Sequence, residues 1–313
     1  METSPATRLP TRSKLGTILR LAGLALCLAL LAFQLDPAVL LAAGEQVDRA
    51  SLGVACVAWI VGMLLRSGKW MVQVRALGLD FQPAALVRAQ LWGVLAGVVT
   101  PLRLGEAYRL SGISLRNVDD AALPAAAIFY EKMVEAHVLF CIVVVGVFTY
   151  FDQPGVAAAL AGVALFGAWV AYGEVSLPQA VLRRVRPLAL LQASRDALSG
   201  RGRAAVLGLT ILSHAANFVG GGSMYRALGD IGWGALCFGL PTITFSSAVP
   251  FTVSGIGVRE LVAIEVFRGT GLSPEAITLA ATSSFLGANV LPTLVLLPVV
   301  IAGSWIFQAP AGR

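Results

Sequence analysis

The tetrapeptide RALG occurs twice, at residues 75–78 and 226–229, and a proline follows each copy after about two dozen mostly apolar residues. These prolines, Pro101 and Pro250, lie 26 and 24 residues after the arginine that starts each copy. Each opens a short polar run that contains glycine, PLRLGEAYR in the first case and PFTVSGIGVRE in the second. A four-residue match can arise by chance, but the matched distances and breaks favour an internal repeat. Paired interruptions of apolar segments are typical of membrane proteins whose binding site lies between two repeats.

The composition is that of a membrane protein. Hydrophobic residues make up 57% of the 313 residues, charged residues make up 13%, and the mean hydropathy is +0.80. A soluble domain has about 25% charged residues. Stretches apolar enough to cross a bilayer lie at roughly 15–35, 50–70, 121–150, 154–173, 204–225 and 274–307, and two more, 83–100 and 234–250, end at the prolines. The first stretch lacks a small-residue cleavage site and further spans follow, so we do not expect a signal peptide.

The distribution of arginine predicts the orientation. The 174–203 loop carries six arginines, which makes it cytoplasmic by the positive-inside rule. Alternation from this loop places the N-terminus in the cytoplasm, as expected of a multi-pass protein of a bacterial inner membrane. The net charge of +6 does not indicate nucleic-acid binding, because the basic residues are sorted by loop and do not form a patch on a soluble face.

We therefore predict an all-α integral membrane protein with about six full transmembrane helices and two re-entrant hairpins, arranged as an inverted repeat. Residues 1–313 would form a single polytopic domain. Its first half-repeat would cover about 50–150 and its second about 204–307, joined by the span 154–173 and the loop 174–203.

Proline and glycine define the expected breaks. Pro101 would end its helix, because it lacks an N–H and restricts the residue before it. Gly105 would permit a tight turn, and Gly93 and Gly97 would let a neighbouring segment pack closely. After the second break, the chain would resume as a helix from Val258.

Charged residues inside the spans are the candidate functional groups, since a charge at the bilayer centre costs about 2.5–3.5 kcal/mol. Glu131 and Glu135 share one face of the 121–150 helix, with Lys132 between them. They could hold a cation or a basic headgroup, or pair with Arg103 or Arg109. An ion pair that only fixes the hairpin against this helix is the structural alternative.

A second group of charges lies in the two breaks themselves, where Arg103, Glu106 and Arg109 correspond to Arg259 and Glu260. Arginine is suited to bidentate phosphate binding, and the N–H groups of broken helices attract anions. The phosphate of a lipid headgroup is therefore the expected ligand. The alternative is that these charges pair with one another.

Other chemistry is poorly supported. The chain has two histidines and four cysteines without metal-ligand spacing, so we expect no metal and no cofactor. His214 and Asn217 share a helix face and could join a polar path, although an intramembrane histidine is more often a packing residue.

Three motifs resemble those of the lysylphosphatidylglycerol synthase transmembrane family, whose members are also described as flippase-like. They are PLRLGExxR from Pro101, YEKxxE at 130–135 and SGIGVRE at 254–260. The resemblance extends over nearly the whole chain. It implies a membrane domain that moves or presents lipids with polar headgroups, including aminoacylated phospholipids, hopanoids and polyprenyl-linked sugars.

The chain departs from the family pattern in ways that leave the substrate open. It contains no soluble aminoacyl-transferase domain, so we expect a stand-alone membrane domain that does not synthesise lysylphosphatidylglycerol. Residues 251–253 stand where a glycine-rich run is common, and Ser283 and Ser284 stand where an arginine is often found.

The sequence therefore favours a lipid translocator with membrane lipids, and no nucleic acid, as partners. The alternatives are a membrane-embedded enzyme or accessory subunit that works with lipid-synthesis enzymes, and an ion-coupled transporter of small solutes. The candidate substrate-binding residues are Arg103, Gly105, Glu106, Arg109, Glu131, Glu135, Ser254, Gly255, Gly257, Arg259 and Glu260.

Overall fold

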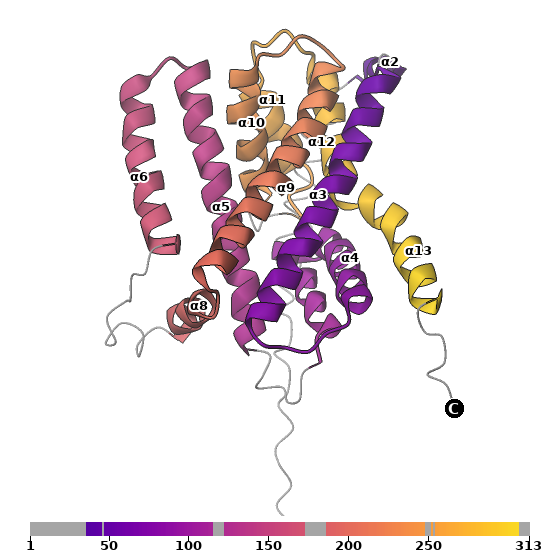
Figure 1. Ribbon diagram of the computed structural model, residues 1–313. Helices are drawn as coiled ribbons and strands as arrows, with labels where there is room; N and C mark the ends of the chain where they lie inside the picture. The colour runs from indigo at the N-terminus through magenta and orange to yellow at the C-terminus, as the bar shows by residue number, and fades with distance from the viewer. Residues whose placement is uncertain are drawn as a thin grey trace, which may run out of the picture.

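The computed structural model describes residues 36–45, 47–114, 122–172, 186–247, 252 and 254–306. Their regular structure is helical, apart from an isolated bridge between Phe81 and Ile113. The helices are α2 (Pro37–Glu45), α3 (Arg49–Ala76), α4 (Pro83–Val99), the 3₁₀ helix η1 (Pro101–Gly112), α5 (Ala122–Tyr150), α6 (Pro154–Tyr172), α8 (Arg186–Asp196), α9 (Gly200–Arg226), α10 (Trp233–Ser246), α11 (Val258–Val266), α12 (Pro274–Asn289) and α13 (Leu291–Ile306) (Figure 1).

Four helical segments of the described residues are long and apolar enough to cross a membrane: α3, α5, α9 and the α12–α13 pair. They match four of the predicted spans. The last of these is divided at Val290, and α13 continues from α12 in a changed direction (Figure 1). Pro292 lies directly after this break and cannot donate a backbone hydrogen bond, which explains it. The predicted span 154–173 forms α6, whereas the predicted span 15–35 lies outside the described residues.

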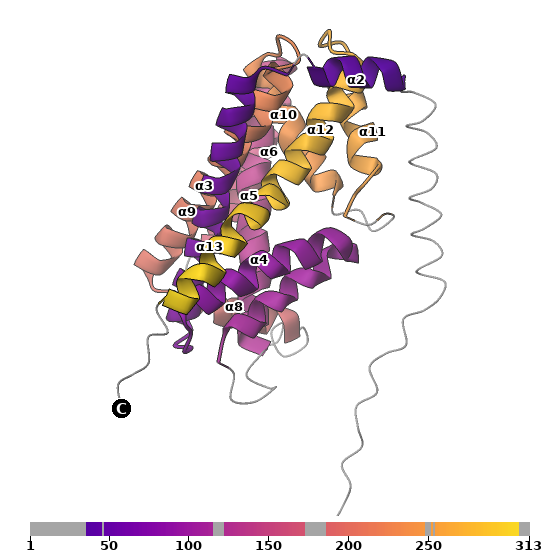
Figure 2. The same ribbon diagram turned by 90° about the vertical axis from the view of Figure 1, so that its right-hand side faces the viewer.

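The two interrupted segments lie toward opposite ends of the bundle. The α4–η1 pair is at the end where α8 lies, and α10 and α11 are at the end where α2 lies crosswise (Figures 1 and 2). The prediction that Pro101 ends a helix is confirmed, because α4 stops at Val99 and η1 begins at the proline. The predicted restart at Val258 is confirmed by α11. Pro250 lies outside the described residues.

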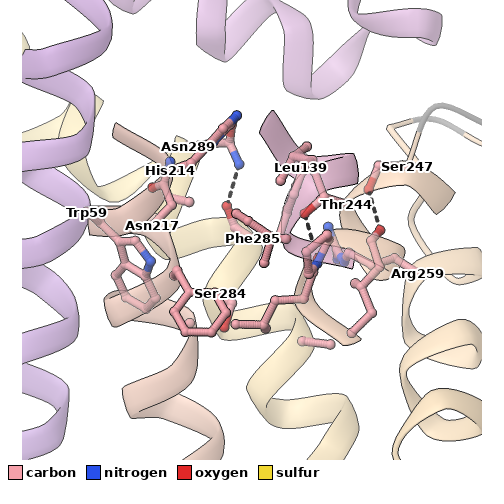
Figure 3. Close-up of a pocket in the computed structure, with 18 of the residues that line it drawn as sticks. Trp59, Leu139, His214, Asn217, Thr244, Ser247, Arg259, Ser284, Phe285 and Asn289 are labelled. Atoms are coloured by element: carbon pink, nitrogen blue, oxygen red, sulfur yellow. Dashed lines mark hydrogen bonds between the residues drawn. The ribbon is translucent and has the colours of Figure 1, made fainter. Parts of the chain in front are cut away.

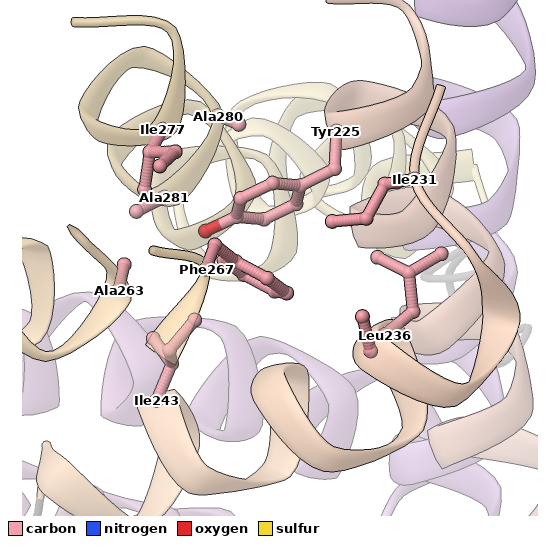
Figure 4. Packing of buried hydrophobic residues seen from close by; sticks show 10 residues of the cluster. Tyr225, Ile231, Leu236, Ile243, Ala263, Phe267, Ile277, Ala280 and Ala281 are labelled. Carbon is pink, nitrogen blue, oxygen red and sulfur yellow. The ribbon is translucent and has the colours of Figure 1, made fainter. Parts of the chain in front are cut away.

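Each interrupted segment has its own apolar support. Around α10 and α11, the buried rings of Tyr225 and Phe267 lie 4.6 Å apart between α9, α11 and α12, with Leu236 and Ile277 in the same cluster (Figure 4). Around α4, a separate cluster joins α3, α4 and α5 through Trp70, Val74, Leu86, Ile113 and Ala127. Burial of apolar side chains therefore fixes both segments to the long helices.

Glycine brings η1 against α4. A Cβ atom on Gly93 would lie 3.0 Å from Cγ of Arg109, and one on Gly97 would lie 3.1 Å from Cγ of Glu106, which supports the predicted close packing. Gly105 is a correction to the predicted turn. Its φ is not positive; instead, a Cβ there would lie 2.2 Å from the backbone carbon of Ala96. Gly105 is therefore required for close approach between η1 and α4.

Candidate functional site

The first break presents its charges in one row. Residues three apart lie on the same side of a 3₁₀ helix, which has three residues per turn, and Arg103, Glu106 and Arg109 have this spacing in η1. Nη1 of Arg103 lies 3.7 Å from one carboxylate oxygen of Glu106, and Nη1 of Arg109 lies 4.0 Å from the other. Arg103 adopts a positive φ of 54°, an unfavourable conformation for a side-chain-bearing residue.

This row is joined to α5 and α3 by buried ion pairs. Nη2 of Arg109 lies 2.7 Å from Oε2 of Glu131, and Nζ of Lys69 lies 3.1 Å from Oε1 of the same carboxylate. The side chains of all three residues are completely buried. The guanidinium of Arg109 also stacks 4.4 Å from the ring centre of Trp70. The predicted pairing between the first break and Glu131 is confirmed.

The remaining charges close the network. Nζ of Lys69 lies 2.7 Å from Glu135, which confirms that Glu131 and Glu135 face the same way. Nζ of Lys132 lies 2.8 Å from Glu106 and 3.1 Å from Glu135. Each of the three carboxylates thus has at least two cationic partners, as burial of a carboxylate requires. We call Lys69, Glu106, Arg109, Glu131, Lys132 and Glu135 the charge network.

The second break is built from left-handed backbone. Ser254, Gly255 and Gly257 have φ values of 52°, 75° and 85°. Gly257 precedes the first residue of α11, and its N–H donates to Oε2 of Glu260 at 2.7 Å. Glycine adopts such angles without steric cost, which explains the two glycines of this motif.

Glu260 has further partners on two elements. Its Oε1 accepts hydrogen bonds from the guanidinium of Arg259 and, at 3.0 Å, from Oγ1 of Thr282 on α12. Arg259 and Glu260 are both buried. This carboxylate is therefore occupied by its own neighbours.

The two breaks meet. Oγ of Ser254 lies 2.9 Å from the carbonyl oxygen of Gly97 and 2.6 Å from that of Val98, so its hydroxyl can donate to the end of α4. Arg103 and Arg259, one from each break, lie over the ring of Phe285, with guanidinium carbons 5.9 Å and 4.0 Å from the ring centre. The chain thus brings together residues 156 and 157 positions apart in sequence.

A cavity of about 150 Å³ opens beside these arginines (Figure 3). Its basic lining residues are Arg66, Arg103 and Arg259, which come from α3, η1 and α11. Its other lining residues with polar side-chain atoms are Trp59, His214, Asn217, Tyr225, Thr244, Ser247, Ser284 and Asn289. No carboxylate is found among the described residues that line it. We call this space the arginine cavity.

Several polar atoms at the arginine cavity have no partner within the described part of the chain. They are Nε and Nη1 of Arg259, Nε2 of His214, the hydroxyl of Tyr225 and Oγ of Ser284, all of them buried. Arg66 is half-buried, and no described carboxylate lies within ion-pair distance of it. Buried polar groups in proteins are nearly always hydrogen-bonded, so these atoms indicate a place for a polar ligand or water.

The structure divides the candidate residues that the sequence placed in one site between two separate places. Arg103 and Arg259 line the cavity, whereas Arg109, Glu131 and Glu135 belong to the charge network. Arg66 and Lys69 were not among the candidate residues, but α3 continues to Ala76 and carries both in the bundle. The sequence signal that could have identified Arg66 and Lys69 is their position inside an apolar helix that continues past residue 70. His214 and Asn217, which the sequence suggested as part of a polar path, line the arginine cavity.

These features define a multi-pass helical membrane protein with two interrupted segments that meet beside a basic cavity. The chain belongs to the family described as the lysylphosphatidylglycerol synthase transmembrane region, whose sequence profile matches residues 17–295. The resemblance noted from the three motifs is thereby confirmed. No curated protein sequence matches the chain closely enough to count as a relative.

Proposed function

We propose that this protein moves a lipid with a phosphate-bearing headgroup between the leaflets of a bacterial inner membrane. The observation that carries the proposal is the arginine cavity, in which Arg103 and Arg259 converge from the two breaks. Guanidinium groups bind phosphate through directed, charge-assisted hydrogen bonds. Membership of a family named for a lipid-modifying synthase supports a lipid-related role.

The proposed architecture makes the site reachable from both leaflets. About six full spans would surround two re-entrant hairpins related as an inverted repeat, within one polytopic domain whose N-terminus is cytoplasmic. The placement of α4–η1 and α10–α11 toward opposite ends of the bundle supports such an arrangement (Figure 1). Irregular backbone at membrane depth must line a cavity or be covered by protein, and the contact of Ser254 with the carbonyls of Gly97 and Val98 is consistent with this requirement.

In this proposal, the candidate residues have two roles. Arg103 and Arg259 neutralise the headgroup phosphate, and the turn formed by Ser254, Gly255 and Gly257 places Arg259 beside the cavity. Within η1, Gly105 and Glu106 place Arg103. The carboxylates of Glu131, Glu135 and Glu260 hold the basic side chains that support both breaks.

Reconstitution tests the proposal. Purified protein would be placed in liposomes with fluorescent lipids of several headgroup classes, and leaflet exchange followed by quenching with a membrane-impermeant reductant. We expect accelerated exchange of phosphate-bearing lipids by the natural sequence and little by Arg103→Gln. Arg268→Gln is the matched control, because the side chain of this arginine is 72% exposed and lies outside the cavity. No acceleration for any lipid by folded protein would contradict the proposal.

A further inference from the structure

The charge network and the arginine cavity differ in their balance of positive and negative side chains. Every carboxylate in the network contacts at least two cations at 4.0 Å or less. Glu260, the carboxylate nearest the second break, accepts from Arg259, Gly257 and Thr282. Each carboxylate of these two groups therefore already has a cationic partner in the described part of the chain.

The arginine cavity has the opposite balance. Arg66 has no described carboxylate within ion-pair distance, and Glu106, which is 3.7 Å from Arg103, is shared with Lys132 and Arg109. Nε and Nη1 of Arg259 remain without hydrogen-bond partners, as do Nε and Nη1 of Arg109, so the two regions differ in how many carboxylates accompany their cations. Positive potential therefore exceeds negative potential in the cavity, and in a low-dielectric setting this disfavours any additional cation strongly.

The neutral groups complete a recognisable donor set. Oγ of Ser284 and Nε2 of His214 are buried without partners in the described chain, and Asn217 lines the same cavity (Figure 3). Hydroxyl, imidazole and amide groups are suited to hydrogen bonds with phosphate oxygens and with the hydroxyls of a polyol. The cavity volume of about 150 Å³ is roughly ten times the ~10–15 Å³ that one ordered water needs.

We infer that the arginine cavity selects a phosphate ester of net negative charge that carries no ammonium group, and that it rejects aminoacylated headgroups. A lysyl ester of phosphatidylglycerol brings two ammonium groups for one phosphate, and the cavity offers arginines where those groups would need carboxylates. The inference rests on the proposed function for its lipid, but the selection by charge follows from the cavity alone.

Binding by headgroup class tests the inference. Delipidated protein would be titrated with phosphatidylglycerol, phosphatidylcholine and lysyl-phosphatidylglycerol of identical acyl chains, with bound lipid counted by native mass spectrometry. Phosphatidylglycerol is expected to bind about tenfold or more tighter than the lysylated lipid, because the cavity arginines repel the two ammonium groups of the lysyl ester. Equal or tighter binding of the lysylated lipid would overturn the inference.

Two matched pairs of variants locate the effect. Arg66→Gln should weaken phosphatidylglycerol binding about tenfold, whereas Arg75→Gln should not, since Arg75 lies on the same helix but stacks on Phe81 outside the cavity. Ser284→Ala should weaken binding by a smaller factor than Arg66→Gln, and Ser283→Ala should leave it unchanged, because only Ser284 lines the cavity. Melting temperatures check that each variant is folded. Equal binding by folded Arg66→Gln and Arg75→Gln would overturn the assignment.

Further arms separate the ligand's source and the two proposals. Glycerol 3-phosphate and inorganic phosphate would be tested for thermal stabilisation. If glycerol 3-phosphate matches phosphatidylglycerol, the selected ester is water-soluble, so the inference holds and the translocator proposal fails. If inorganic phosphate matches it, the cavity does not select an ester, and the inference fails. Binding that is selective for phosphatidylglycerol, without any leaflet exchange, would also support the inference and contradict the translocator proposal. Leaflet exchange that prefers the lysylated lipid would leave the translocator standing and overturn the inference.

Discussion

The charge network and the arginine cavity use the same kinds of residue for different ends. In the network, Arg109, Lys69 and Glu131 are fully buried and balance one another's charge, although Nε and Nη1 of Arg109 have no hydrogen-bond partner among the described residues. In the cavity, Nε and Nη1 of Arg259 have no hydrogen-bond partner in the described chain, and Arg66 has no described carboxylate within ion-pair distance. A charged residue inside a membrane protein is often taken as a sign of function, but the partners decide the role. Charges that are balanced by near neighbours hold elements together, whereas an excess of positive charge can bind an anionic ligand.

The largest expected effect comes from the network. Glu131→Ala removes the carboxylate that Arg109 and Lys69 share and leaves them only Glu106 at 4.0 Å and Glu135 at 2.7 Å, which should cost about 3–5 kcal/mol and lower the amount of folded protein in the membrane. Abundance and melting temperature measure it. Glu265→Gln is the control, because the Glu265–Arg268 pair is exposed and such pairs contribute about 0–1 kcal/mol. Similar melting temperatures for the two variants would show that the network does not stabilise the fold.

A second prediction compares a glycine that is required for close helix packing with a glycine that faces open space. Gly105→Ala places a Cβ 2.2 Å from the Ala96 backbone, so η1 must move away from α4, at a cost of about 3 kcal/mol. Gly53→Ala is its counterpart, because nothing lies within 4 Å of the added atom and alanine favours a helix by about 0.5–1 kcal/mol. Thermal unfolding should therefore shift in opposite directions. A neutral Gly105→Ala would contradict the observed packing of η1 on α4.

The smallest effect concerns the contact between the breaks. Ser254→Ala removes the hydroxyl that reaches the carbonyls of Gly97 and Val98 and should cost about 1 kcal/mol. Because the two breaks would then be joined less firmly, headgroup binding should weaken as well. Ser246→Ala removes a hydroxyl that bonds only within α10, and its binding should match that of the natural sequence. Unchanged binding in Ser254→Ala would show that the contact is dispensable for the site.

Local features of the sequence predicted much of the fold. Pro101 ended α4 as expected, α11 began at Val258, and Glu131 and Glu135 shared a face because of their helical spacing. The pairing of Arg109 with Glu131 followed from the cost of an unpaired buried charge. Each of these depends on neighbours in sequence or on a single long-range pairing.

The arginine cavity could not be predicted in the same way. Its basic residues come from α3, η1 and α11, and its other polar groups come from α3, α9, α10 and α12. Their convergence depends on how the helices pack, which single-residue patterns do not specify. Lys69 was missed because α3 continues beyond the end expected from hydropathy, so that its lysine lies inside the bundle. The 3₁₀ form of η1, which aligns Arg103 with Arg109, likewise depends on its packing against α4.

The central claim is that the charge network holds the fold while the arginine cavity binds the headgroup. The most direct test compares Glu131→Gln with Arg66→Gln in liposomes, measuring leaflet exchange of phosphatidylglycerol per folded molecule. We expect Glu131→Gln to lower the yield of folded protein while the surviving molecules keep their exchange rate. Arg66→Gln should fold normally and lose about tenfold in exchange. Normal folding with lost exchange in Glu131→Gln, together with full exchange in Arg66→Gln, would contradict the claim.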